Sequence, residues 1–319
     1  TDQLVAGGST SQNSNRITAT SVNNQGGNLI SVGQSSSSSA MSASSAVVND
    51  QSGVNTSVLA TVKNAEVATR IGYTSKTNSG TATVDSNSIS AMADGNVSGS
   101  TTALAASTLS VSANISGTQG VTLNANGGTA SAGVGVTSLN TQSNNGLVLT
   151  ATNESTQILL LSAIPSSPAT AEAVSSFQGV LTNNTLNAAA SGNTAVSTVS
   201  TTATTASGLS ATVGNSQSNA LTTDNISAVA GSSSKTLNIK LLTGDATNSQ
   251  LSLSNDSILA TARSNRASDS LTVNVSASGS GPTTLFTSTD PTFTAGDPNQ
   301  SSKPTSALAD LTVANAQVH

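Results

Sequence analysis

The stretch Asn87-Ser88-Ile89-Ser90-Ala91-Met92-Ala93-Asp94-Gly95-Asn96 contains the pattern that decides the fold of this chain. Every second residue from Ile89 onward is apolar or small, and an asparagine stands at each end. An alternation with period two predicts a β-strand with one buried face, and asparagine tolerates the backbone conformations of tight turns. We therefore expect a turn-bounded strand here.

The same pattern recurs along the sequence with other residues between its fixed positions. Each copy begins with Asn or Asp, has Ile or Leu two residues later, and has Ala two residues after that. The copies start at Asn15, Asn87, Asn184, Asp224 and Asp256. Consecutive copies begin 72, 97, 40 and 32 residues apart, and the first two spacings are near multiples of about 24. The sequence thus predicts a degenerate repeat of about 24 residues.

The composition restricts how such strands can be buried. Charged residues make up 7% of the 319 residues and aromatic residues 1%, so a core of large aromatic side chains is excluded. Few aromatics together with much Ser, Gly and Asn is also typical of disorder. Disorder of that kind usually comes with high net charge or low hydrophobicity, whereas this chain has a net charge of -5 and is 35% apolar. We expect an ordered body whose core consists of many small side chains.

A repeat of this length cannot bury its apolar stripe alone, and stacking on a neighbouring repeat completes the core. We therefore predict an all-β fold, a β-solenoid or β-helix-like stack of these repeats, over residues 1–278. The alternative is a β-sandwich built from hairpins. Residues 279–306 contain four of the six prolines, which favours an extended connector, and residues 307–319 form a last strand.

Three local features add expectations of their own. Residues 23–27 (Asn-Asn-Gln-Gly-Gly) predict a turn between two paired strands. The run Ile158-Leu159-Leu160-Leu161 predicts a strand that is buried on both faces. Residues 169–176, which follow a proline, are the one place where a short helix is plausible.

The residues that catalysis and metal binding use are sparse. The single histidine is His319 and there is no cysteine, which excludes a Ser-His-Asp arrangement, disulfides and thiolate zinc sites. The fourteen Asp and Glu are spread evenly, so we expect no enzyme. Asp94-Gly95 and Gly244-Asp245 could be calcium loops, but ordinary turns explain them better. We expect neither a metal nor a cofactor.

Charge and hydropathy also limit the partners of the chain. Nine scattered Lys and Arg and a pI of 4.6 do not provide the basic patch that nucleic acid requires. The longest aliphatic run is four residues, so we expect no insertion into a membrane.

Copies of the form Asn-x-Ile-x-Ala-x-Ala-x-Gly-Asn in a cysteine-free chain rich in Ser, Thr, Asn, Gly and Ala resemble the bacterial β-strand-repeat surface and secreted proteins. These include filamentous-haemagglutinin-like adhesins and extracellular matrix fibres. The resemblance extends over most of residues 15–276. It implies an extracellular or cell-surface location and a structural or adhesive function, and it supplies no site residues.

These observations favour a subunit of an extracellular bacterial filament, sheath or surface layer that pairs with itself through β-strands. We expect residues 307–318 to add as a strand to the next subunit. The residues expected at that contact are Leu308, Leu311, Val313 and Val318. The alternative is the passenger rod of an adhesin that binds a glycan or another cell. Deletion of residues 305–319 should leave folded monomers that do not polymerise.

Overall fold

All regular elements in the described part of the chain are β-strands. The computed structural model describes residues 2–4, 8–34, 45–72, 77–110, 121–125, 128–132, 135–164, 167–171, 173–207, 210–219, 225–275, 292–297, 300–308 and 311–318. The strands form six sheets, and this confirms the all-β class that the alternation predicted.

The chain passes repeatedly through five parallel sheets, in the order sheet 1 to sheet 5. Sheet 1 contains β2 (Ser9–Asn13), β7 (Thr77–Asp85), β15 (Val174–Thr182), β20 (Ala246–Thr247) and β21 (Gln250–Ser254). Sheet 2 contains β3 (Arg16–Gly33), β8 (Ser88–Ser110), β16 (Thr185–Ser207) and β22 (Ser257–Val275). Sheet 3 contains β4 (Ser45–Val54), β11 (Gly135–Asn145), β17 (Ser210–Asn219) and β25 (Leu311–Val318). Sheet 4 contains β5 (Ser57–Lys63), β12 (Val148–Glu154) and β18 (Asn225–Ala230). Sheet 5 contains β1 (Asp2–Leu4), β6 (Glu66–Gly72), β13 (Gln157–Ile164) and β19 (Asn238–Leu242), with β14 (Ser167–Ala171) antiparallel to β13.

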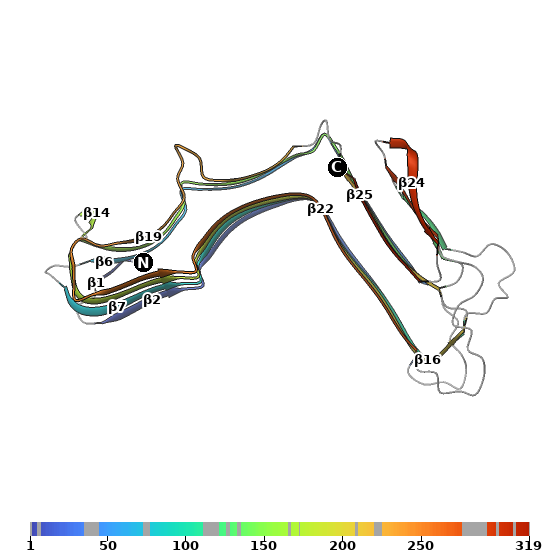
Figure 1. Ribbon diagram of the computed structural model, residues 1–319, viewed down its shortest axis with the longest axis horizontal. Helices are drawn as coiled ribbons and strands as arrows, with labels where there is room; N and C mark the ends of the chain where they lie inside the picture. Colours follow the sequence, from blue (N-terminus) through green and yellow to red (C-terminus); the bar gives the residue numbers. More distant parts are fainter. Residues whose placement is uncertain are drawn as a thin grey trace.

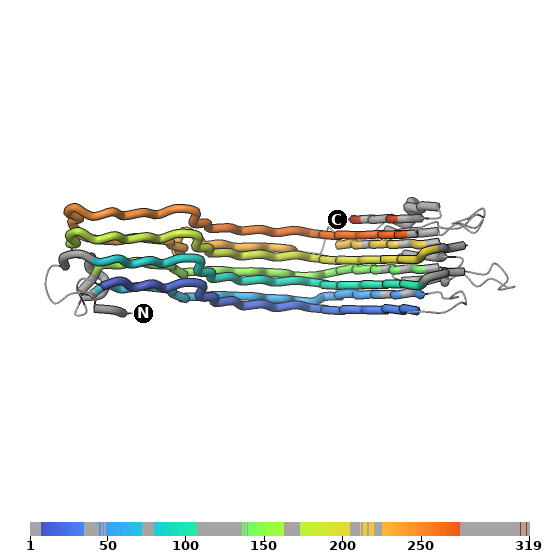
Figure 2. Tube along the Cα trace, turned by 90° about the horizontal axis from the view of Figure 1, so that it is seen from below, coloured from blue at the N-terminus to red at the C-terminus, as the bar shows by residue number. Residues whose placement is uncertain are grey.

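One pass through these sheets makes one flat layer, and the layers lie on top of one another. Layer 1 contains β2 to β6, layer 2 contains β7, β8 and β11 to β13, layer 3 contains β15 to β19, and layer 4 contains β20 to β22 with β25. Figure 1 looks down the stack, so that the strands of one sheet overlie each other. Figure 2 shows the layers from the side, in order from blue at the N-terminal end to orange.

The stacked unit is much longer than the predicted repeat of about 24 residues, and that prediction is wrong. In sheet 2, partners in adjacent layers are 72, 97 and 72 residues apart, because Asn15 meets Asn87, Asn87 meets Asn184, and Asn184 meets Asp256. The copy that starts at Asp224 has its Ile226 and Ala228 in β18, on the facing wall, in sheet 4. The other four copies occupy the same position in each of the four layers.

The parallel pairing also contradicts a sandwich built from hairpins, since a hairpin makes antiparallel neighbours. The predicted turn at residues 23–27 is not formed, because these residues lie inside the continuous strand β3. There Asn24 pairs with Asn96 of the next layer. A turn sequence is thus overridden by pairing between layers.

The two longest insertions between layer strands form the antiparallel sheet 6. It contains β9 (Val121–Ala125), β10 (Gly128–Ala132), β23 (Thr292–Asp297) and β24 (Gln300–Leu308), in the order β24-β23-β10-β9. β23 lies in the expected connector, residues 279–306, and β24 begins in it and ends at Leu308. Pro304 lies in β24, an edge strand of this sheet, and edge strands are where sheets accept proline.

The corner between sheets 1 and 2 is built the same way in every layer. The residue before each repeat copy has a positive φ: 57° at Ser14, 56° at Ser86, 56° at Asn183 and 55° at Asn255. Asparagine is among the residues that tolerate this left-handed conformation best. The expectation that turn-forming residues close each strand is confirmed at these corners.

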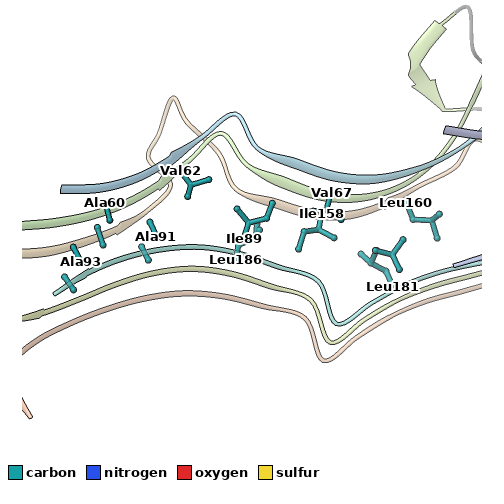
Figure 3. Close-up of a cluster of buried hydrophobic side chains, with 14 of the residues drawn as sticks. Ala60, Val62, Val67, Ile89, Ala91, Ala93, Ile158, Leu160, Leu181 and Leu186 are labelled. Carbon is teal, nitrogen blue, oxygen red and sulfur yellow. The ribbon is translucent and has the colours of Figure 1, made fainter. Parts of the chain in front are cut away.

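The main apolar core lies between sheets 1 and 2 on one side and sheets 4 and 5 on the other (Figure 3). Small and branched residues fill it, among them Ile89, Ala91, Leu149, Ile158 and Leu186, each 0% exposed. A smaller cluster lies between sheets 2 and 3 and includes Leu104, Val136, Val199, Ala203, Ala211 and Val213.

The aliphatic run in β13 is buried on both faces, as predicted. Ile158 and Leu160 face the main core, whereas Leu159 and Leu161 pack on Ala68 in a separate cluster. The short helix expected at residues 169–176 is not present, since β14 ends at Ala171 and β15 begins at Val174. Strand pairing therefore overrides the local helix propensity there.

Candidate assembly interface

The two ends of the stack are the features of this fold most suited to a function. β22 and β25 are edge strands of sheets 2 and 3 in layer 4, and β3 and β4 are the opposite edge strands in layer 1. We call the first pair, with β21, the C-terminal end face, and the second pair, with β2, the N-terminal end face. An edge strand presents a row of unpaired N–H and C=O groups to any further strand.

The apolar core extends to the C-terminal end face, and no strand among the described residues covers it there. Ile258 continues the column of Ile89 and Leu186 but is 48% exposed, whereas both residues beneath it are 0% exposed. Leu253 is 54% exposed and lies on Leu181, which is 0% exposed. Both side chains are buried on the side of layer 3 and open on the other side.

Polar columns also cross all four layers. The Asn15 ladder (Asn15, Asn87, Asn184, Asp256) has Nδ2 to Oδ1 distances of 2.9, 3.0 and 2.9 Å. The Asn24 ladder (Asn24, Asn96, Asn193, Asn265) has distances of 2.7, 2.9 and 2.8 Å. In the Gln51 ladder (Gln51, Gln142, Gln217, Gln317), the distances from Nε2 to Oε1 are 2.8, 2.7 and 2.9 Å. Stacked amides of this kind stabilise assemblies of parallel, in-register strands.

The Asn24 ladder is cross-linked to the facing wall. Asn96 Nδ2 donates to Asn144 Oδ1 at 3.0 Å, and Asn144 Nδ2 donates to Asn193 Oδ1 at 2.8 Å. Asn219 Nδ2 donates to Asn265 Oδ1 at 2.7 Å. The network ties sheet 2 to sheet 3 in layers 2 to 4, where the core between the walls is polar.

Each ladder has a constant direction. In the Asn15 and Asn24 ladders every amide nitrogen donates toward the C-terminal end face, and in the Gln51 ladder every amide nitrogen donates toward the N-terminal end face. In the Asn24 and Gln51 ladders the two ends therefore differ, one with a donor outermost and the other with an acceptor, and opposite end faces are complementary. The Asn15 ladder differs from these two, because it ends in the carboxylate of Asp256.

The C-terminal end face also carries a partly buried carboxylate. Asp269 Oδ1 accepts a hydrogen bond from Asn215 Nδ2. Burial raises the pKa of Asp269 to about 6, and the hydrogen bond from Asn215 opposes this rise. The group therefore titrates near neutral pH.

The sequence singled out four residues for assembly, and the structure brings three of them onto one strand. Leu311, Val313 and Val318 lie in β25 opposite Ala211, Val213 and Ser218 of the same chain. Leu308 lies in β24, opposite Thr292, in another sheet. β25 thus pairs within the chain, and its other edge belongs to the C-terminal end face, where Val313 is 52% exposed.

The sequence reasoning did not find Ile258, Leu253 or the amide ladders as parts of an end face. The signal for Ile258 was present, because it occupies the Ile/Leu position of the last repeat copy. What was missing was the layer order, which makes the last copy an end.

Among the described residues there is no group of three or more His, Cys, Asp or Glu side chains that could hold a metal ion. Those residues also include no helix with the length and hydropathy that crossing a membrane requires. Asp94 and Gly95 lie inside β8 and not in a turn, whereas Gly244 and Asp245 lie in a bend between β19 and β20. Comparison with models of protein families, with curated proteins and with solved structures found no match.

Proposed function

We propose that this chain is a structural subunit of an extracellular bacterial filament, sheath or surface layer, in which copies stack end to end through parallel strand pairing. In this proposal the four layers are coils of a β-solenoid that continues from one copy into the next. The observation that carries it is the uncapped core at the C-terminal end face, where Ile258 and Leu253 are about half exposed above fully buried equivalents.

The register supports stacking of the C-terminal end face on the N-terminal end face of a second copy. If the register between layers continued by one layer, it would bring chemically matched residues together. The pairs, with the residue of the second copy given second, are Ile258 with Ile17, Ala260 with Ala19, Asn265 with Asn24, Val273 with Val32, Val313 with Val47 and Gln317 with Gln51.

The constant direction of the Asn24 and Gln51 ladders favours this head-to-tail arrangement. A head-to-tail contact joins two different surfaces, and it generates an open filament when no rotation closes it into a ring. In this arrangement residues 311–318 join the next subunit through the open edge of β25 while they stay paired with β17.

The extracellular location rests on the resemblance to bacterial surface and secreted proteins. Both the resemblance and the proposed stacking favour a structural function for this protein.

A lysine in place of Ile258 tests the proposal against a matched control. Ile258 and Leu259 are 48% and 49% exposed, but Ile258 lies above the buried Leu186, and Leu259 faces outward on the other side of β22. Stacking would bury the introduced ammonium group against Ile17 of a second copy, and an unpaired buried charge is strongly unfavourable. We expect filaments from the wild type and from Leu259→Lys, and none from Ile258→Lys, in negative-stain images.

Folding is checked separately by circular dichroism, since both substitutions lie at half-exposed positions and should leave the strands intact. Equal polymerisation of the two variants would contradict stacking through this face. Wild-type particles of fixed monomeric mass in light scattering would favour the adhesin alternative.

Deletion of residues 305–319 is a second, less selective test. It removes β25 and residues 305–308 of β24, and it uncovers Ala211 and Val213, both 0% exposed in the full chain. We expect monomers that do not polymerise and that also unfold at lower denaturant concentration than the full chain. Filaments of unchanged length in images of the truncated chain would rule out a part for β25 in the contact.

A further inference from the structure

The Asn15 ladder ends in a carboxylate. Asp256 Oδ1 accepts hydrogen bonds from Asn184 N at 2.8 Å and from Asn184 Nδ2 at 2.9 Å. Its second oxygen, Oδ2, is buried and has no hydrogen-bond partner among the described residues. In an asparagine this atom would be the Nδ2 that donates to the next layer.

Layers 2 and 3 show what the missing donor does. Asn87 Nδ2 donates to the Gln12 carbonyl at 3.1 Å, and Asn184 Nδ2 donates to the Val84 carbonyl at 3.1 Å. The register places Leu181 in the corresponding position beneath Asp256. An ionised carboxylate is acceptor-only and can donate neither to that carbonyl nor to an Oδ1 above it.

Asp269 repeats this situation further along the chain, within β22. The side chains in its column are Asn28, Ser100 and Ser197 in the layers below, so the carboxylate replaces uncharged groups. Its Oδ2 is buried without a hydrogen-bond partner among the described residues. In the outermost layer both carboxylates therefore hold a buried oxygen that has no hydrogen-bond partner among the described residues.

The neighbouring strands offer these carboxylates no counter-ion. β15, β16, β17, β18, β21 and β25 contain no charged residue. β22 itself contributes Arg263 and Arg266, whose side chains are exposed. On the N-terminal end face, β2, β3 and β4 carry only Arg16 and Asp50, both exposed, and Arg16 Nε donates to its own Thr18 Oγ1 at 3.1 Å.

From this placement we infer that the carboxylates of Asp256 and Asp269 oppose end-to-end stacking and that stacking takes up a proton at Asp269, so that acid favours assembly and neutral pH opposes it. The inference rests on the proposed function. A second copy in continued register puts Asn15 over Asp256 and Asn28 over Asp269. The contact removes the remaining water from both carboxylates, and it sets the Asn15 Oδ1 against the acceptor-only carboxylate of Asp256.

The direction of the pH dependence follows from the linkage between proton binding and assembly. A carboxyl group whose pKa is raised binds its proton more tightly in the stacked form than in the free chain, so the stack binds more protons. Assembly is therefore strongest at low pH, and it weakens as the pH rises through the value of about 6 for Asp269 in the free chain.

The experiment measures the critical concentration for sedimentation of the full-length chain at about pH 5.5 and about pH 7.5. For the wild type we expect an increase of about ten-fold or more between the two conditions. Asp256→Asn and Asp269→Asn should each lower the critical concentration at the higher pH toward the acid value. Asp245→Asn removes the same charge from an exposed bend near the same end and should have little effect.

The outcomes separate the inference from the function on which it rests. Equal critical concentrations at the two pH values, or an effect of Asp245→Asn as large as that of Asp256→Asn, would overturn the inference and leave stacking intact. No polymer from any of these chains at either pH would overturn the proposed stacking itself.

Discussion

Replacement of Gly95 by alanine should lower the free energy of unfolding by about 3 kcal/mol. A Cβ atom on Gly95 would lie 2.2 Å from the carbonyl oxygen of Gly192 in the layer above and 3.0 Å from Leu147 Cδ2. The first of these atoms belongs to the backbone, so the clash is relieved only if two layers move apart. Because Gly95 and Gly192 sit between matched pairs of β8 and β16, that movement would strain ladder hydrogen bonds on both sides.

Gly99, four residues along the same strand, provides the control. A Cβ atom there meets nothing within 4 Å, so Gly99→Ala should change stability by no more than about 0.5 kcal/mol. Both variants are compared with the wild type by chemical denaturation followed by circular dichroism, under conditions where the chain is monomeric. Equal stabilities of the two variants would show that the layers are less closely packed at Gly95 than the structure has them.

The face of each strand could be predicted from the sequence because alternation reports burial directly. In β5 the side chains of Val58, Ala60 and Val62 are buried and their neighbours are more exposed, as a period of two requires. The positive φ at Ser86 and Asn183 could likewise be predicted, since polar turn residues stand before each strand.

Partner strands could not be predicted in the same way. Alternation is identical in a strand that pairs with its neighbour in sequence and in one that pairs 72 or 97 residues away. It is also identical on the two walls of a layer, which is why the copy at Asp224 was grouped with the copies of sheet 2. The insertions at residues 111–134 and 276–310 hide the common layer length further.

The assembly residues were only partly predictable for a related reason. A terminal alternating segment, residues 307–318, indicates a strand, but its sequence does not say whether the strand pairs within the chain or with another copy. In the structure β17 accepts it, because Gln317 Nε2 reaches Gln217 Oε1 at 2.9 Å and extends the Gln51 ladder to a fourth layer.

The other large effect is expected at Asn193, which lies at the centre of the cross-linked Asn24 ladder. Its side chain is 0% exposed, and its Oδ1 accepts from Asn96 Nδ2 at 2.9 Å and from Asn144 Nδ2 at 2.8 Å. Its Nδ2 donates to the Ser218 carbonyl at 3.1 Å and to Asn265 Oδ1 at 2.8 Å. Alanine at this position removes all of these bonds and fills none of the space.

Asn193→Ala should therefore destabilise the chain by about 3 kcal/mol or more, since buried donors and acceptors in three layers lose a partner together. Asn187→Ala is the control on the same strand: Leu186 and Ala188 on either side point into the core, so Asn187 points outward, and its loss should cost less than about 0.5 kcal/mol. Chemical denaturation of the two variants measures the difference in their free energies of unfolding. If Asn193→Ala proved no worse than Asn187→Ala, the stacked strands alone would hold the layers together, and the amide ladders would set only their register.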